Sequence, residues 1–142
     1  MNAPTTEEMK LVRESFDRVR PIANFLASQF YNRLFDLVPE TRSLFKRNAA
    51  ADQYRMLMTG LATLIREADR PDKFSSFAQG LAIRHVSFGV TPDHYEAAAQ
   101  ALIETLQQGL GSDFTGDVRR AWSSFCGALF TEMRHAASAH VT

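Results

Sequence analysis

The stretch LAIRHVSFGVTPDHY, residues 81–95, carries the clearest structural signal in the sequence. A helical run that contains His85 stops at Phe88-Gly89-Val90, and a new helix is expected to begin with Thr91 as its N-cap and Pro92 in its first turn. An imidazole among apolar neighbours needs partners for its two ring nitrogens. His85 is therefore either a core histidine bonded to a backbone carbonyl or a metal ligand, and its spacing alone leaves both interpretations open.

The helical pattern extends in both directions from this stretch. Apolar residues recur at spacings of three or four nearly throughout, and no segment keeps a period of two. Thr5 and Glu8 predict a capping box at the first helix, and Thr115 is expected to cap the last one. Two further long helices are expected over about 52–68 and 73–87. The predicted fold class is all-α, with about six main helices and short connections.

The composition indicates one globular domain. The chain has 142 residues, of which 45% are hydrophobic and 23% charged, so we expect a single domain over 1–142 with flexible tails at 1–4 and 136–142. Lys and Arg total 16, as do Asp and Glu, and this balance argues against nucleic-acid binding. No apolar run is long enough to span a membrane, the N-terminus is unlike a signal peptide, and Cys126 has no partner for an internal disulfide. We therefore expect a cytoplasmic protein.

Few residues in the sequence suggest chemistry. His135 and His140 fall in the expected tail, and His94 is expected to be exposed in the first turn of a helix. Tyr31 and Gln53 are polar residues in otherwise apolar helices. Taken singly, Tyr31 is expected to bond a backbone carbonyl at the edge of the core and Gln53 to face solvent.

Taken together, these residues resemble the globin family, and most closely the bacterial single-domain haemoglobins and the haem domain of flavohaemoglobins. The resemblance covers about residues 8–133. Three stretches carry it, in order: FYNRLFDLVPETRSLF (30–45), RHVSFGVTPDHY (84–95) and AWSSFCGALF (121–130).

The resemblance implies a haem b cofactor, iron protoporphyrin IX, and a role for each matching residue. His85 matches the proximal iron ligand, and Tyr31 and Gln53 match the distal pair that hydrogen-bonds a gas ligand. The implied haem contacts are Phe45 on the porphyrin, Leu57 and Leu81 on the apolar walls, Arg84 near a propionate, Val90 at the haem edge and Tyr95 behind His85.

The chain departs from the family pattern at three places. Ala137 stands where flavohaemoglobins carry a glutamate beside the proximal histidine and tyrosine, and Glu132 lies more than a turn earlier. Since a carboxylate partner would increase electron donation by the imidazole, this departure argues against peroxidase-like activity. Cys126 replaces a tyrosine and is expected to be a small buried residue. The flavin and nicotinamide domains of flavohaemoglobins are expected to be absent.

Four functions follow from this reading. The first is reversible binding of dioxygen, for storage or delivery, with carbon monoxide gaining less from the distal donors. The second is nitric oxide dioxygenation, which requires an external reductase. The third is a gas or redox sensor that acts through a partner, and the fourth is a haem-free helical interaction domain. A monomer or a homodimer is expected.

Overall fold

The computed structural model describes residues 3–45, 50–87 and 89–141, without the side chains of residues 45, 87 and 139–141. Within these residues the chain is helical and contains no strand, which confirms the all-α prediction with six main helices. The α-helices are α1 (Thr6–Val19), α2 (Ala23–Leu37), α3 (Ala50–Arg66), α4 (Pro71–Ser87), α5 (Asp93–Leu110) and α6 (Gly116–Val141). The 3₁₀ segments are η1 (Arg20–Ile22), η2 (Pro39–Phe45) and η3 (Gly111–Asp113).

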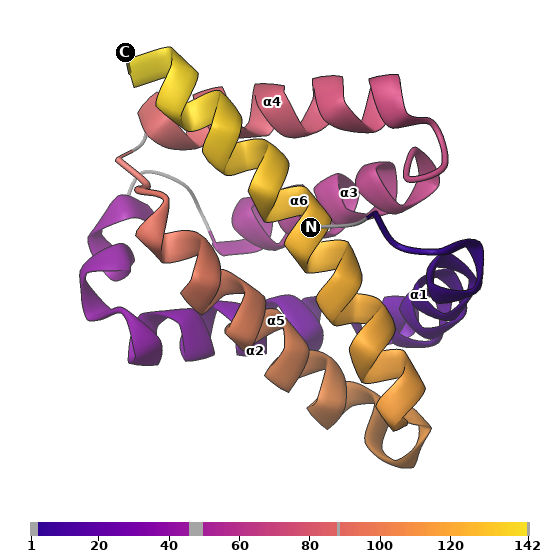
Figure 1. Cartoon of the computed structure of the whole chain (residues 1–142). Coiled ribbons are helices and arrows are strands. Elements are labelled where there is room, and N and C mark those ends of the chain that lie inside the picture. Colours follow the sequence, from indigo (N-terminus) through magenta and orange to yellow (C-terminus); the bar gives the residue numbers. More distant parts are fainter. Residues whose placement is uncertain (1–2, 46–49, 88, 142) are drawn as a thin grey trace.

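The helices pack in two layers. The front layer of Figure 1 is formed by α5 and α6, with α2 and α3 behind them, α4 along the top and α1 on the right. The main contacts join α6 to α4 and to α1, and join α2 to α5 and to α3. The arrangement brings α3 and α4, which carry two of the predicted site regions, next to each other.

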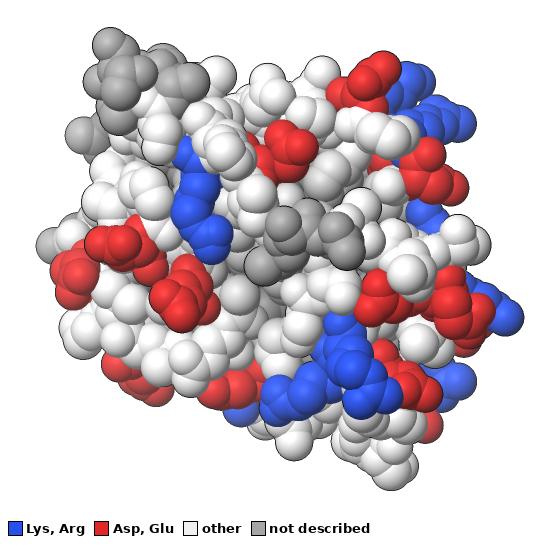
Figure 2. All heavy atoms as spheres, in the orientation of Figure 1, with Lys and Arg blue, Asp and Glu red and all other residues white. Residues whose placement is uncertain are grey.

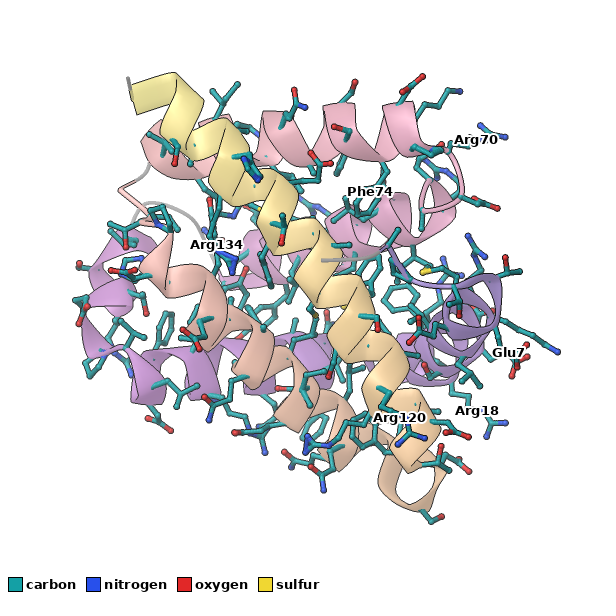
Figure 3. The ribbon with its side chains drawn as sticks, viewed as in Figure 1. Glu7, Arg18, Arg70, Phe74, Arg120 and Arg134 are labelled. Atoms are coloured by element: carbon teal, nitrogen blue, oxygen red, sulfur yellow. The ribbon has the colours of Figure 1, made fainter. Side chains whose placement is uncertain are left out.

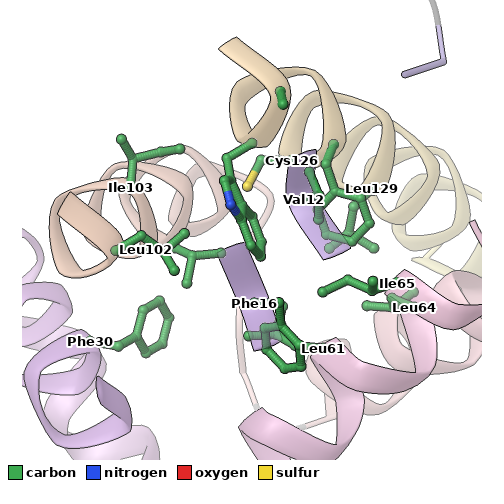
Figure 4. Packing of buried hydrophobic residues seen from close by; sticks show 14 of the residues in the cluster. Val12, Phe16, Phe30, Leu61, Leu64, Ile65, Leu102, Ile103, Cys126 and Leu129 are labelled. Carbon is green, nitrogen blue, oxygen red and sulfur yellow. The ribbon is translucent and has the colours of Figure 1, made fainter. Parts of the chain in front are cut away.

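Trp122 anchors the core between α1 and α6. Its side chain is fully buried, and its indole Nε1–H donates to Ser15 Oγ at 2.8 Å. Ser15 in turn donates to the Leu11 carbonyl oxygen at 2.7 Å, so the buried polar atoms of this contact are satisfied. Phe16 and Phe125 pack against the indole ring, and other side chains of the same apolar core are shown in Figure 4.

The predicted helix starts are confirmed at two of three places. The side chains of Thr5 and Glu8 form the predicted capping box, and Thr115 Oγ1 accepts from the Val118 amide at 3.2 Å. The start of α5 was predicted wrongly. This helix begins at Asp93, and Pro92, the N-cap residue, contributes no side-chain hydrogen bond.

The last helix is the longest described. α6 is helical to Val141 and so includes most of the segment 136–142 for which a tail was expected.

Figure 2 shows acidic and basic side chains scattered over the face formed by α5 and α6, without a single-sign patch. Among the described residues, no helix combines the length and apolar character needed to cross a membrane.

Candidate functional site

The break after His85 is a helix-terminating motif built around Gly89. Gly89 has a φ of 92°, which favours glycine because a side chain would be strained there. The Val90 amide donates to the His85 carbonyl at 2.9 Å, and the Gly89 amide donates to the Val86 carbonyl at 3.0 Å. These are the two hydrogen bonds of a Schellman motif, which ends α4 and places His85 in its last turn.

The ring of His85 is held in one tautomer by its own helix. Nδ1 lies 2.6 Å from the Leu81 carbonyl oxygen. A carbonyl can only accept, so Nδ1 carries a proton, and the neutral ring then has its lone pair on Nε2. Burial lowers the pKa of His85; the bond to Leu81 opposes this effect, and the charge of Arg84 reinforces it. The environment thus favours a neutral imidazole with Nε2 available as a donor to a metal.

Tyr31 and Gln53 are brought together across α2 and α3. The Tyr31 hydroxyl lies 3.5 Å from the backbone carbonyl oxygen of Gln53, a long contact for a hydrogen bond. The hydroxyl thus does approach a backbone carbonyl, as its position at the edge of the core suggested. Gln53 is only 9% exposed, so the expectation that it faces solvent was wrong. Burial, with a smaller contribution from Tyr54, raises the pKa of Tyr31 to about 12, which keeps its hydroxyl protonated as a donor.

Tyr54 is part of this cluster and was not predicted from the sequence. Its ring is stacked on that of Tyr31, with centroids 6.0 Å apart and an interplanar angle of 21°. Phe30 meets the Tyr31 ring edge-on at 5.1 Å, and Phe35 lies at 6.1 Å. The only available signal was that Tyr54 follows Gln53 directly, and adjacent helical positions point in directions about 100° apart.

The predicted apolar contacts lie at the margin of the core. Leu57, Leu81 and Val90 are half-buried and pack against the central cluster. Arg84 is exposed. The side chain of Phe45 and the whole of Phe88 lie outside the described residues, so the contact of Phe45 with the porphyrin stays a prediction.

Tyr95 is buried on α5, but its hydroxyl finds no described partner. The side chain is 2% exposed, stacks on Phe130 with centroids 5.4 Å apart, and its hydroxyl has no hydrogen-bond acceptor among the described residues. Ala137 is buried and offers no carboxylate. Glu132 instead accepts from the Ser75 hydroxyl at 3.0 Å, which links α6 to the first half of α4. Position 137 therefore has no carboxylate, and the described bond of the Glu132 carboxylate is to Ser75 rather than to His85.

His94 has a structural role in place of the expected exposure. Its side chain is only 14% exposed. Its Nδ1 accepts a hydrogen bond from the Thr91 amide at 3.1 Å, which satisfies one of the free amides ahead of α5. Thr91 therefore serves as a backbone donor to His94 and does not cap the helix as predicted. His135 is exposed, and the side chain of His140 lies outside the described residues.

A groove of about 610 Å³ lies between α5 and α6, and Tyr95 is one of its lining residues. Its walls include Glu96 and Glu104 from α5 and Arg119 and Arg134 from α6. Figure 3 shows Arg134 extending from α6 toward α5. Of the predicted site residues, Tyr95 lines the groove, whereas His85 and Tyr31 do not.

A family model decides the classification: the one for Globin matches residues 28–133, most of the chain. The chain is a globin. The match includes α2 with Tyr31, α3 with Gln53 and α4 with His85, and it confirms the family expected from the three sequence stretches.

Individual relatives agree with this assignment. The globin is 25% identical over 122 residues to a flavohaemoprotein of Vibrio cholerae, covering 84% of this chain and 31% of that protein. It spans about a third of the length of the flavohaemoprotein relatives it matches. It is 26% identical to the anaerobic nitrite reductase HBII of Casuarina glauca, covering 83% of this chain and 82% of that protein.

A solved structure confirms the fold. A hexacoordinated haem protein from an anhydrobiotic tardigrade, crystallised at pH 4, superposes with a TM-score of 0.83 over 94% of this globin and 95% of that chain. The sequence identity is 14%, so the likeness concerns the helical arrangement alone.

The residues of this globin fit a haem. His85 combines the three properties of an imidazole iron ligand: it is half-buried, its ring is oriented by a bond from Nδ1, and the neutral form is favoured. The Tyr31 hydroxyl supplies a protonated donor from another helix, α2. Family membership and this donor set together support haem-based gas binding.

Proposed function

We propose that this globin holds a haem b through His85 and binds dioxygen reversibly. The observation that carries the proposal is the bond from His85 Nδ1 to the Leu81 carbonyl, because it leaves the lone pair of Nε2 available to a metal. When bound, the haem supplies an iron with an open coordination position for a diatomic gas. His85, Leu81, Leu57 and Val90 would hold the group, and Arg84 would neutralise a propionate.

The residues of α2 and α3 would set the selectivity among gases. Tyr31 stays protonated well above neutral pH, and its hydroxyl lies 3.5 Å from the backbone carbonyl oxygen of Gln53. Its O–H would donate to a polar ligand bound beside it. In a pocket from which water is excluded, that bond is worth more than in solvent. Dioxygen would gain from it more than carbon monoxide, and the buried Gln53 amide would add a second donor.

A first experiment tests haem binding. The protein is reconstituted with haemin and its Soret absorption is recorded for the unmodified chain, for His85→Ala and for the control His94→Ala. We expect a strong Soret band for the unmodified chain and the control, and loss of haem retention or of ferrous gas binding for His85→Ala. Failure of the unmodified chain to take up haem would favour a haem-free helical interaction domain.

The second candidate is nitric oxide dioxygenation with a separate reductase. It is favoured by the flavohaemoprotein relatives, which extend well beyond the region they share with this chain. The test mixes the oxygenated protein with nitric oxide, a reductase and a nicotinamide cofactor. Nitrate formed over many turnovers would establish the enzyme, whereas a single turnover would leave reversible binding, or a sensor that acts through a partner, as the function.

A further inference from the structure

The groove between α5 and α6 has walls of opposite charge. Glu96 and Glu104 line it from α5, and Arg119 and Arg134 line it from α6. Among the described residues no ion pair joins one wall to the other, and neither arginine pairs with a carboxylate. Glu104 contacts Arg33 of α2, at 3.8 Å, and Glu96 is exposed. Charges of both signs thus face the groove without pairing across it.

The deeper lining of this α5–α6 groove is apolar or small. Ile103 and Cys126 are buried, and Ala99, Gly127 and Phe130 are half-buried, whereas both groove arginines are exposed. The small residues at 99 and 127 allow another backbone to come close. A protein interface has the same plan, with an apolar centre surrounded by a polar rim. The α5–α6 groove therefore has the character of one half of an interface.

A second copy of this chain is the partner that the charges of the groove fit. A two-fold rotation about an axis through the groove places α5 of each copy over α6 of the other. The acidic wall of each copy then faces the basic wall of the other, and walls of like charge are kept apart. The chain has a formal net charge of +0 at pH 7, so no overall repulsion opposes this contact. A partner with charges of a single sign would be repelled by one wall.

We infer that two copies of this chain associate through their α5–α6 grooves, related by a two-fold axis. The inference concerns a surface of the protein and requires neither a haem nor a gas, so it goes beyond the proposed function. Attraction between exposed charges is weak and is screened by salt. The dimer should therefore be sensitive to ionic strength.

The first test measures association of the haem-reconstituted full chain by sedimentation velocity, with detection by protein absorbance. We expect a monomer–dimer equilibrium at low salt. Raising sodium chloride from about 0.1 M to about 1 M shortens the screening length from about 10 Å to about 3 Å, so the dissociation constant should rise at least about tenfold.

Two variants with altered walls locate the contact. Glu96→Arg/Gln100→Arg makes the α5 wall basic, and Arg119→Glu/Arg134→Glu makes the α6 wall acidic; all of these positions line the groove. In either variant the two walls carry the same sign, so each wall repels the wall it would meet in a second copy. We expect the dimer of each variant to weaken at least about tenfold. Both variants should keep the Soret band of the unmodified chain, which shows that they fold.

Each variant has a control with the same change in net charge outside the groove. Glu7→Arg/Gln107→Arg matches the basic variant, and Lys10→Glu/Lys73→Glu matches the acidic one. All four control positions are exposed, and none lines the groove. We expect both controls to dimerise like the unmodified chain.

A mixture of the two groove variants tests the two-fold arrangement. One chain has two basic walls and the other has two acidic walls, so every contact in a mixed dimer is attractive. Native mass spectrometry should show this mixed dimer, although each variant alone is monomeric. Attraction by net charge alone is checked by mixing the basic variant with Lys10→Glu/Lys73→Glu, which should give far less mixed dimer.

Three results would overturn the inference. A chain that stays monomeric up to about 1 mM would leave the groove to another occupant, such as a small molecule. A dimer that the groove variants do not weaken would use a different face of the protein. Equal weakening by the groove variants and their controls would reduce the effect to net charge.

Discussion

Replacing Tyr31 with phenylalanine would test the distal hydrogen bond directly. The substitution removes one hydroxyl and keeps the ring that packs against Tyr54, Phe30 and Phe35. The lost group makes a long contact, at 3.5 Å, with the Gln53 carbonyl oxygen. We therefore expect the fold to be retained and the effect to fall on the gas ligand.

The size of the effect follows from the energy of one hydrogen bond. An ordinary bond contributes about 0.5–1.5 kcal/mol, so dioxygen should leave about two to twelve times faster from Tyr31→Phe. Carbon monoxide, which gains less from a donor, should leave at nearly the same rate. Because the pKa of Tyr31 is about 12, the difference between the two proteins should show no inflection between about pH 6 and pH 10.

The assay is stopped-flow measurement of both dissociation rates on the ferrous protein. The ratio of the dioxygen rate to the carbon monoxide rate separates loss of a hydrogen bond from a general opening of the pocket. An unchanged ratio would show that the Tyr31 hydroxyl does not reach the ligand. If the ratio for the unmodified protein changed with an inflection near neutral pH, a group other than Tyr31 would be responsible.

Three further predictions concern stability and reactivity. Trp122→Ala should lower the free energy of unfolding by about 3–5 kcal/mol in urea titrations followed by circular dichroism, because the indole is fully buried; a loss below about 1 kcal/mol would contradict this. The pKa of Glu8 is lowered, chiefly by its bond from the Thr5 amide, so its carboxylate stabilises the fold above the ordinary Glu pKa and this contribution disappears as the pH falls through the lowered value. Glu8→Gln should accordingly be less stable than the unmodified chain at about pH 7 and equally stable well below the lowered pKa; a difference independent of pH would argue against the bond. Burial raises the pKa of the Cys126 thiol to about 12, so a thiol reagent at about pH 8 should label it only after unfolding, and stoichiometric labelling of the native protein would be the contrary result.

The sequence predicted those features that depend on neighbours along the chain. The capping box of Thr5 and Glu8 and the helix break at Gly89 both form between residues at most five positions apart. The start of α5 also depends on residues close in sequence, yet it was predicted wrongly. The Thr91 amide donates to Nδ1 of His94, and the threonine side chain does not cap the helix. A propensity for capping does not reveal such competition between two possible partners.

By itself, the sequence determined the helices, the position of His85 in the last turn of α4 and, through the resemblance, the family. The helices and the position of His85 follow from periodicity and from hydrogen bonds between residues that are close in sequence. Only the tertiary structure decided that Gln53 is buried, that Glu132 binds Ser75 and that Tyr54 stacks on Tyr31. Such contacts join different helices, and their geometry depends on the angle and depth at which whole helices pack.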